Sequence, residues 1–389
     1  MSLGIELRII QSATTITNKS DVRVLLVLDR LYRGGTEMQA LDVCRNAGRN
    51  GLDLSVASGG GALEGEFRDS GVQYHSFRRR APLDLFLVHR LRQLIKANNY
   101  NIVHTHQAVD ALHAYLAARG TGAKCVVSYQ GDFHDSRNRR VLEYLIPRVG
   151  ANIACSKGMR SWLAEQGLDS SGFKVIYNGV DEKRLTYQGP DLREELDLDQ
   201  DTLLFGMVAH FYPGQRKDQM TLCEAFTRVA RDMPEAHLIL VGRVVAGAEA
   251  KYAECLRTVT EAGLASRVHF LGQRSDLAKI VESLDIYVFS SLQEGLPIAL
   301  MEAMLSHKPT ILSDIEPHLE VSCNGEYALT FRTGNADDLA LRMTELARDP
   351  DKRRMIADRA YTFAKRTFSI DAHIANLQHV YASVLGEAL

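Results

Sequence analysis

The sequence predicts an α/β protein built from two doubly wound, parallel-sheet domains. Its 389 residues exceed what one ordinary hydrophobic core accommodates, so two domains are expected. Short apolar, β-rich runs alternate with helical stretches, which is typical of parallel sheets covered by helices on both faces. The alternation stops in the polar stretch 181–201 and then restarts, which indicates a linker with a short helix followed by a second sheet of the same kind.

Each expected strand is an apolar or β-branched run bounded by polar or turn residues. The first half contains seven such runs, at 22–28, 54–58, 72–77, 101–106, 124–129, 151–155 and 173–177, and the second half contains five, at 202–209, 237–242, 267–272, 285–289 and 309–313. Helical patterns follow at 337–348, 351–366 and 370–385, and we expect the last to cross back onto the first domain. The predicted domains are 22–185 with 370–389, and 186–369, after a flexible N-terminal segment 1–21.

Composition excludes several classes of protein. A net charge of −2 gives no whole-chain argument for nucleic-acid binding. No run reaches the ~18 apolar residues of a membrane-spanning helix, and 1–20 lacks the pattern of a secretory signal, so we expect a cytoplasmic protein. The six cysteines are scattered without a CxxC pair, which favours buried reduced thiols over disulfides or zinc ligands.

The stretch 290–304, SSLQEGLPIALMEAM, carries the clearest indication of a ligand. A loop containing Gly295 leads from a buried strand into a helix that we expect to start at Pro297, so free backbone N–H groups and the positive helix end would favour an anion. Glu294 and Glu302 would repel a phosphate and suit sugar hydroxyls instead. A nucleotide-sugar combines both chemistries. The alternative is that this loop only connects a strand to a helix.

The loop after the first strand contains Gly34 and Gly35, which allow close approach of a ligand. Thr36 and Gln39 are spaced as a capping box, so a helix is expected to begin there. A plain tight turn is the alternative. The glycines after the second strand do not continue into GxGxxG, because Glu64 stands at the last glycine position, so a dinucleotide fingerprint is absent.

His104 and His106 lie two residues apart on an expected strand, so both should point to one face. No third ligand follows at a recognisable spacing, which disfavours a metal site. Their place near the carboxyl end of a parallel strand predicts that they line a ligand cleft.

Arg216 and Lys217 lie in a Gly/Pro loop just before a helix start. Two cations are unfavourable at the positive helix end, so an anionic ligand would explain them. Solvent-facing charges are the alternative.

A basic region follows the third strand. It consists of Arg78, Arg79, Arg80, Arg90, Arg92 and Lys96. Such a run is usually a solvated face, and the functional alternative is peripheral contact with anionic lipid at the inner face of the membrane.

Together these segments resemble the family 4 (group 1) glycosyltransferases, which are retaining enzymes with the GT-B fold. The resemblance rests on an ordered series that covers nearly all of the chain after residue 21. The series is Gly34-Gly35-Thr36-Glu37, Val103-His104-Thr105-His106, the segment VIYNGVD at 175–181, Gly206-Met207-Val208 with Lys217, Leu271-Gly272, and Glu294 spaced eight residues from Glu302.

The resemblance implies a role for each matching position. Glu294 would hold donor-sugar hydroxyls, Glu302 the ribose, and Arg274 would lie at the nucleobase. Lys217, with Arg216, would stabilise the leaving phosphates. The diphosphate cradle would be Gly295, Leu296, Pro297, Ile298 and Ala299, and Gly34 and Gly35 would contribute from the opposite domain.

Two positions depart from the family pattern. His210 stands where the family often has an arginine, and Arg216 could compensate for it. Gln130 stands where a histidine commonly contacts the donor sugar, with His134 close by. Both departures bear on the identity of the sugar more than on the reaction class.

The resemblance implies a glycosyltransferase that needs no metal or cofactor, because cations and amides supply the positive charge. A UDP-sugar is favoured over a GDP-sugar as donor, and the acceptor is a glycan, a lipid-linked molecule or a small molecule. The alternatives are a nucleotide-sugar epimerase, a phosphorylase or a non-catalytic two-domain sugar-nucleotide-binding protein.

Overall fold

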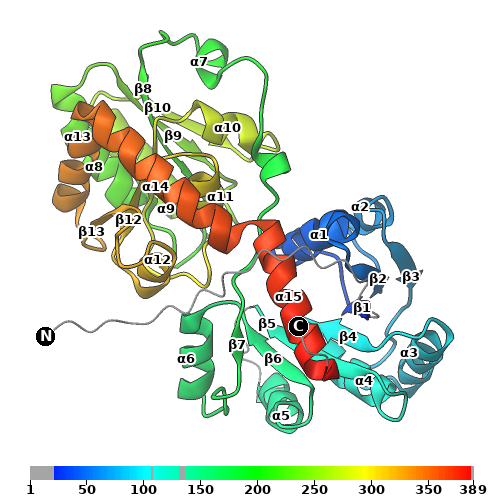
Figure 1. Cartoon of the computed structure of the whole chain (residues 1–389). Helices are drawn as coiled ribbons and strands as arrows, with labels where there is room; N and C mark the ends of the chain where they lie inside the picture. The colour runs from blue at the N-terminus through cyan, green and yellow to red at the C-terminus, as the bar shows by residue number, and fades with distance from the viewer. Residues whose placement is uncertain (1–21, 107, 131–135, 215, 387–389) are drawn as a thin grey trace, which may run out of the picture.

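The computed structural model describes residues 22–106, 108–130, 136–214 and 216–386. It shows two α/β domains, each with one parallel sheet (Figure 1). The predicted N-terminal segment 1–21 lies outside the described residues.

The first domain holds a seven-stranded sheet in the order β3-β2-β1-β4-β5-β6-β7, with every pair parallel. All seven strands expected for this half are present. They are β1 (Arg23–Leu28), β2 (Asp53–Ser58), β3 (Gln73–Ser76), β4 (Ile102–Thr105), β5 (Lys124–Tyr129), β6 (Ala151–Ala154) and β7 (Lys174–Val175).

Helices cover both faces of this sheet, and a separate apolar cluster lies under each layer. One face packs against α1, α2 and α15, and the other against α3 to α6. The elements are α1 (Gly35–Ala47), η1 (Gly48–Asn50), α2 (Glu64–Arg68), α3 (Leu85–Ala97), α4 (Ala108–Ala118), α5 (Ser136–Leu145) and α6 (Lys157–Glu165). Burial on both faces explains why the strands are apolar without alternation.

The second domain repeats the plan with a parallel sheet in the order β10-β9-β8-β11-β12-β13. Its strands are β8 (Leu203–Val208), β9 (Ala236–Val241), β10 (Val268–Gly272), β11 (Ile286–Phe289), β12 (Thr310–Ser313) and β13 (Leu329–Phe331). Five were expected. The sequence analysis missed β13, because this edge strand has three residues, too few for a recognisable apolar run.

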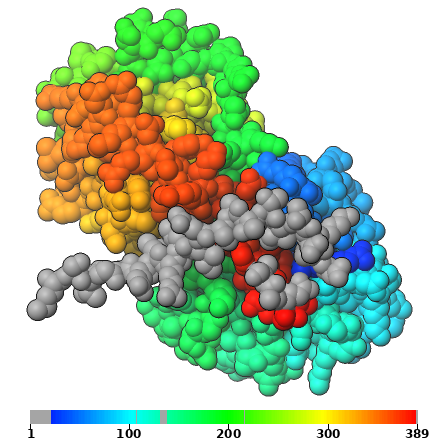
Figure 2. Space-filling model, in the orientation of Figure 1, coloured from blue at the N-terminus to red at the C-terminus, as the bar shows by residue number. Residues whose placement is uncertain are grey.

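A linker with η2 (Glu182–Leu185) and α7 (Leu192–Glu195) leads into this domain. Its helices are α8 (Gln219–Asp232), α9 (Glu249–Glu261), α10 (Leu277–Ser283), α11 (Ile298–Leu305), α12 (Glu316–Val321), α13 (Ala336–Arg348) and α14 (Pro350–Phe368). The final helix, α15 (Ile370–Leu385), leaves α14 and packs on the first domain, as predicted (Figures 1 and 2).

The two connections between the domains meet at one point. Val180 donates to the carbonyl of Phe368 (2.9 Å) and accepts from the N–H of Ile370 (2.9 Å), so the linker pairs with the break between α14 and α15. Ser369 sits at this break and caps α15 with its side chain. Gly179 allows the approach, because a Cβ there would lie 2.9 Å from the Cα of Ile370.

Two local predictions about helix starts were wrong. Thr36 and Gln39 form no capping box: α1 begins at Gly35, and the N-cap is Gly34 without a side-chain bond. The Gln39 amide is instead bonded to His373 Nε2 of α15 (2.6 Å), a partner that the local sequence does not reveal. Pro297 is the N-cap of α11 and not its first residue.

Candidate functional site

The carboxyl edges of the two sheets approach each other through two loops. Gly34 and Gly35 follow β1, and a Cβ on Gly35 would lie 3.4 Å from Ile298 Cδ1 in the second domain. Leu296, from the same second-domain loop, packs against the cores of both domains. A Cβ on Gly34 would lie 2.7 Å from the Glu37 carboxylate, so a larger residue there would displace that side chain. The loops are therefore close enough to act on one ligand.

The loop before α11 has the features of an anion site. The amides of Gly295, Leu296, Ile298 and Ala299 donate to no acceptor within the described part of the chain, and α11 has no side-chain cap. Pro297 has no N–H, so the predicted amide cradle reduces to these four residues. Free amides at the start of a helix favour negative charge.

Lys217 and Glu294 form the charged centre of this site. The Lys217 ammonium donates to Glu294 Oε1, which also accepts from the Ser291 hydroxyl (2.6 Å), and it lies 4.3 Å from the centroid of the Phe289 ring. Burial lowers the pKa of Lys217 from its ordinary value, and Glu294 opposes that shift. The ion pair holds a largely buried cation beside the free amides.

This centre lies at the switch point of the second sheet, where β8 and β11 are neighbours and the chain proceeds to opposite sides. The loops after these strands are joined: Lys217 pairs with Ser291 in an antiparallel bridge, and the Arg216 carbonyl accepts from the N–H of Leu292 (2.7 Å). Arg216 itself is exposed. Open parallel sheets bind ligands at such a point.

Glu302 makes a contact that crosses between the domains. Arg184 of η2 donates to Glu302 Oε1 (2.5 Å) and to Asp42 Oδ2 of α1 (2.9 Å), and the Asp42 side chain is 1% exposed. Burial raises the pKa of Asp42, and Arg184 lowers it. The sequence analysis missed Arg184, and no local pattern marks it, because both partners are remote along the chain.

His210 and Arg274 border the second-domain edge. His210 follows β8, and its Nδ1 accepts from the backbone N–H of Arg243 (3.1 Å). Burial, aided by the charges of Arg243 and Lys217, lowers the pKa of His210, so it adds little positive charge near neutral pH. Arg274 follows β10 and pairs with Glu195 (2.6 Å) and Asp276 (2.7 Å). Its nucleobase contact stays a prediction.

Two of the predicted residues, Gln130 and His106, lie at the carboxyl edge of the first-domain sheet. Among the residues that the structure describes, the buried amide oxygen of Gln130, after β5, has no hydrogen-bond partner, and neither has Nδ1 of His106, after β4. These unpaired polar atoms leave both predictions open. The other predicted donor contact in this loop, His134, lies outside the described residues.

The prediction that His104 lines the cleft was wrong. Its side chain is 2% exposed, with Nδ1 bonded to the Tyr381 hydroxyl (2.7 Å) and Nε2 to the Ser128 hydroxyl (2.8 Å). The reason is α15, which carries Tyr381 and covers this face of the sheet. The histidine rings do share a face, as predicted, with centroids 5.1 Å apart.

Across the residues that the structure describes, no group of three or more His, Cys, Asp or Glu side chains is placed to hold a metal ion. No helix in those residues is long and apolar enough to span a bilayer.

Two family models match the chain. The one described as "Glycosyltransferase Family 4" matches residues 33–184, and the one described as "Glycosyl transferases group 1" matches 189–363. The two matches together cover most of the chain and meet in the linker.

Individual proteins agree with these matches. The chain is 29% identical over 240 residues to a UDP-Gal:α-D-GlcNAc-diphosphoundecaprenol α-1,3-galactosyltransferase of Escherichia coli, covering 58% of this chain and 60% of that protein. It is 25% identical over 331 residues to the putative glycosyltransferase EpsD of Bacillus subtilis, covering 79% and 84% of the two chains. The crystal structure of Anabaena HepE with UDP and glucose superposes with a TM-score of 0.76 at 22% identity, covering 93% of this chain and all of that one.

Proposed function

Because the chain belongs to the group 1, family 4 glycosyltransferases and has the GT-B fold, we propose that it transfers a sugar from a nucleotide-sugar donor. The proposed donor is a UDP-sugar, and the sugar is transferred with retention of its anomeric configuration. A GDP-sugar is the less favoured donor, and the acceptor is a glycan, a lipid-linked molecule or a small molecule. The Escherichia coli relative is named for a UDP-sugar and a lipid-diphosphate acceptor, and HepE was crystallised with UDP, which supports this choice.

One observation carries the proposal: a buried lysine, a carboxylate and free helix-start amides converge at the switch point of the second sheet. This set matches a nucleoside-diphosphate sugar group by group. The amides and Lys217 would contact the diphosphate, Glu294 the sugar hydroxyls and Glu302 the ribose. Before the donor binds, Glu294 neutralises Lys217, so the cation stays charged in a partly buried site.

The bond that breaks joins the anomeric carbon to a phosphate oxygen, so negative charge grows on the departing diphosphate. Lys217, Arg216 and the free amides stabilise that charge in place, which is where preorganised donors have their largest effect. The acceptor oxygen forms the new bond to the anomeric carbon, and its proton leaves with the nucleoside diphosphate. Approach of the two domains would exclude water, which otherwise competes as acceptor.

The proposal includes no cofactor and no catalytic metal, because the chain's own cations and amides offer the positive charge that the leaving group needs. Full transfer in the presence of a strong chelator is the expected result. Activity restored only by a divalent cation would contradict this part.

The decisive experiment is a thermal-shift screen of the full chain against a panel of sugar nucleotides, followed by product analysis with the best donor. Stabilisation by one UDP-sugar and transfer of its sugar to an acceptor are expected. Rearranged donor would indicate an epimerase, sugar phosphate formed from inorganic phosphate a phosphorylase, and binding without turnover a non-catalytic protein.

A further inference from the structure

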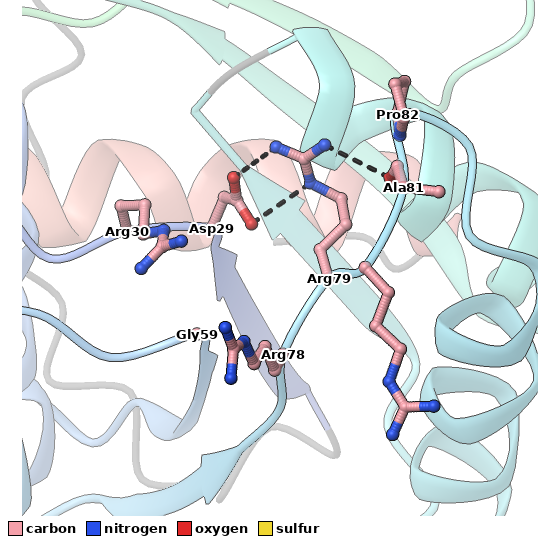
Figure 3. A pocket seen from close by; sticks show the side chains of 8 residues that line it. Asp29, Arg30, Gly59, Arg78, Arg79, Ala81 and Pro82 are labelled. Carbon is pink, nitrogen blue, oxygen red and sulfur yellow. Dashed lines mark hydrogen bonds and ion pairs between the residues drawn. The ribbon is translucent and has the colours of Figure 1, made fainter.

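A second positively charged site lies in the first domain, at the carboxyl edge of its sheet. It is a cavity of about 200 Å³ formed by residues that follow three neighbouring strands (Figure 3). Asp29 and Arg30 come after β1, Gly59 after β2, and the segment 78–82 after β3. At about 30 Å³ per water molecule, the cavity has room for roughly six waters, which is enough for a phosphate group.

Two of the arginines that line this cavity, Arg79 and Arg80, contact neighbouring residues of the same domain, and the other two do not pair with a carboxylate in the described residues. Arg79 donates to both oxygens of Asp29 (3.2 and 2.5 Å) and to the carbonyl of Ala81 (3.3 Å), which fixes the loop (Figure 3). Within the described residues, the guanidinium groups of Arg30 and Arg78 form no ion pair, whereas that of Arg80 lies over the Phe86 ring, 5.5 Å from its centroid. The lining therefore holds four guanidinium groups and one carboxylate, a local excess of positive charge.

The rest of the predicted basic region lies outside the lining of the cavity. Arg92, on α3, donates to the carbonyls of Leu116 (2.7 Å), Ala117 (3.2 Å) and Arg119 (3.1 Å), so it closes the carboxyl end of α4. The region 78–96 is thus not one uniform basic face. Of its six cations, Arg78, Arg79 and Arg80 line the cavity, whereas Arg90, Arg92 and Lys96 lie on α3, outside the lining.

Exposed apolar side chains begin where the cavity ends. Leu83, Leu85 and Phe86 are 50%, 68% and 57% exposed, and they directly follow the lining residue Pro82. Tyr32, two residues after Arg30, is 62% exposed. Unpaired cations beside an exposed apolar patch suit a ligand that joins an anion to a hydrocarbon chain.

We propose that this cavity binds the phosphate of a lipid-linked acceptor, with Arg30 and Arg78 contacting the phosphate oxygens and the patch Leu83–Leu85–Phe86 contacting the hydrocarbon chain. The proposal rests on the proposed function, since it assigns the acceptor class of that reaction. Guanidinium groups bind phosphate oxygens in pairs and with charge assistance, which makes arginine better suited than lysine to this task.

The location agrees with that role. The cavity opens at the same sheet edge as Gly34 and Gly35, which face the donor loop of the second domain. Each domain would then hold one anion at its own carboxyl edge: the nucleotide diphosphate in the second domain and the acceptor phosphate in the first. Separate sites keep the two charged groups apart while the sugar passes between the substrates.

The test uses isothermal titration of the full chain with farnesyl diphosphate, inorganic pyrophosphate and UDP. Farnesyl diphosphate is titrated with and without saturating UDP, so that binding to the donor loop is separated from binding to the cavity. The variants are Arg30→Ala/Arg78→Ala, Leu85→Ser/Phe86→Ser and Lys217→Ala. Arg348→Ala, an exposed arginine of α13, is the matched control for lost charge.

With UDP present, farnesyl diphosphate should bind the unaltered protein at least tenfold more tightly than pyrophosphate. The double arginine variant should lose ten- to a hundredfold of that affinity, the loss expected for removing charge-assisted hydrogen bonds, and Arg348→Ala should lose none. The double apolar variant should bind the two anions alike. Lys217→Ala should weaken UDP and spare farnesyl diphosphate, and the arginine variant should do the reverse, which also shows that both are folded.

Farnesyl diphosphate affinity unchanged by the arginine substitutions would overturn the proposal, and so would equal binding of pyrophosphate and farnesyl diphosphate to the unaltered protein. Arginine-dependent binding to phosphatidylglycerol vesicles without binding of farnesyl diphosphate would overturn it in favour of bilayer contact. Failure of UDP to bind would remove the proposed function alone, because the UDP-free titration still reports on the cavity.

Discussion

The two domains share a strand order but carry different chemistry at equivalent positions. Apart from β7, the sheets match strand for strand, with β1 corresponding to β8, β3 to β10 and β4 to β11. After β8 come the cations Arg216 and Lys217, whereas after β1 come Arg30 and then the glycines Gly34 and Gly35. Topology therefore decides where ligands can bind, and the loop residues decide which ligand is bound.

The fourth strands show the same contrast. The β11 end is followed by Ser291 and Glu294, which face the ligand loop. On β4 itself, the polar residue His104 is bonded to the Tyr381 hydroxyl of the crossing helix α15. The first domain thus uses polar groups to attach α15, and the second uses them at the candidate donor site.

The contrast is tested most strongly at Lys217, the largely buried cation that pairs with Glu294 in the second domain. Lys217→Ala should lower kcat by about 10²–10³-fold, roughly 3–4 kcal/mol, because the leaving diphosphate loses its nearest positive charge. Steady-state kinetics with the best donor measure the effect, and Lys174→Ala, an exposed lysine of β7, is the control. A turnover number close to that of the control would remove Lys217 from the mechanism.

The two glutamates of the donor site should separate sugar binding from nucleotide binding. Glu294→Ala should lower kcat about a hundredfold, roughly 2.7 kcal/mol, while UDP still binds, because Glu294 is proposed to hold the sugar. Glu302→Ala should instead weaken UDP. Kinetics and calorimetry on both variants check this. If both weaken UDP equally and neither changes kcat, the division of roles is wrong.

Arg184 joins the two domains, and its shape should matter more than its charge. Arg184→Lys keeps the cation but loses the fork that reaches Asp42 and Glu302 together. We expect UDP affinity to fall about tenfold, or 1.4 kcal/mol, because Glu302 is no longer oriented from the first domain. The control for exchanging the two kinds of cation is Lys183→Arg, one residue earlier in η2, which should leave the affinity for UDP unchanged. Calorimetry showing wild-type affinity for UDP in Arg184→Lys would restrict Arg184 to a structural role.

The sequence predicted some features that depend on neighbouring residues, although the capping box at Thr36 and the helix start at Pro297 were wrong. The loop from Glu294 to Ala299 lies next to its own strand and helix, so its free amides followed from local pattern. The partners of His104, Gln39 and Arg184 lie 277, 334 and 118 residues away, and those contacts were not predicted. A loop feature such as the free amides depends on one contiguous segment, whereas these side-chain contacts join segments that only the folded structure brings together.

The smallest expected effect concerns two buried histidines, His106 after β4 and His373 on α15. Burial lowers the pKa of His106 to about 3 and that of His373 to about 4, so both are neutral in the folded protein. In the unfolded chain a histidine takes up a proton near pH 6.5. Each of these histidines therefore lowers the free energy of unfolding as the pH falls below that value. Asp110 has the opposite effect on stability. Burial raises its pKa to about 7, so the folded protein takes up a proton before the unfolded chain does, and Asp110 stabilises the folded protein as the pH falls below 7.

A single substitution isolates one histidine from these opposing groups. His106→Leu removes a ring whose buried Nδ1 has no partner among the described residues. The free energy of unfolding of the variant, relative to that of the wild type, should therefore rise by about 0.8 kcal/mol between pH 8 and pH 6. Urea unfolding of both proteins at the two pH values measures the change, and His89→Leu, at an exposed position of α3, should show none. A difference between His106→Leu and wild type that does not grow with acidity would mean that His106 is already charged or solvated in the folded protein, as a cleft-lining residue would be.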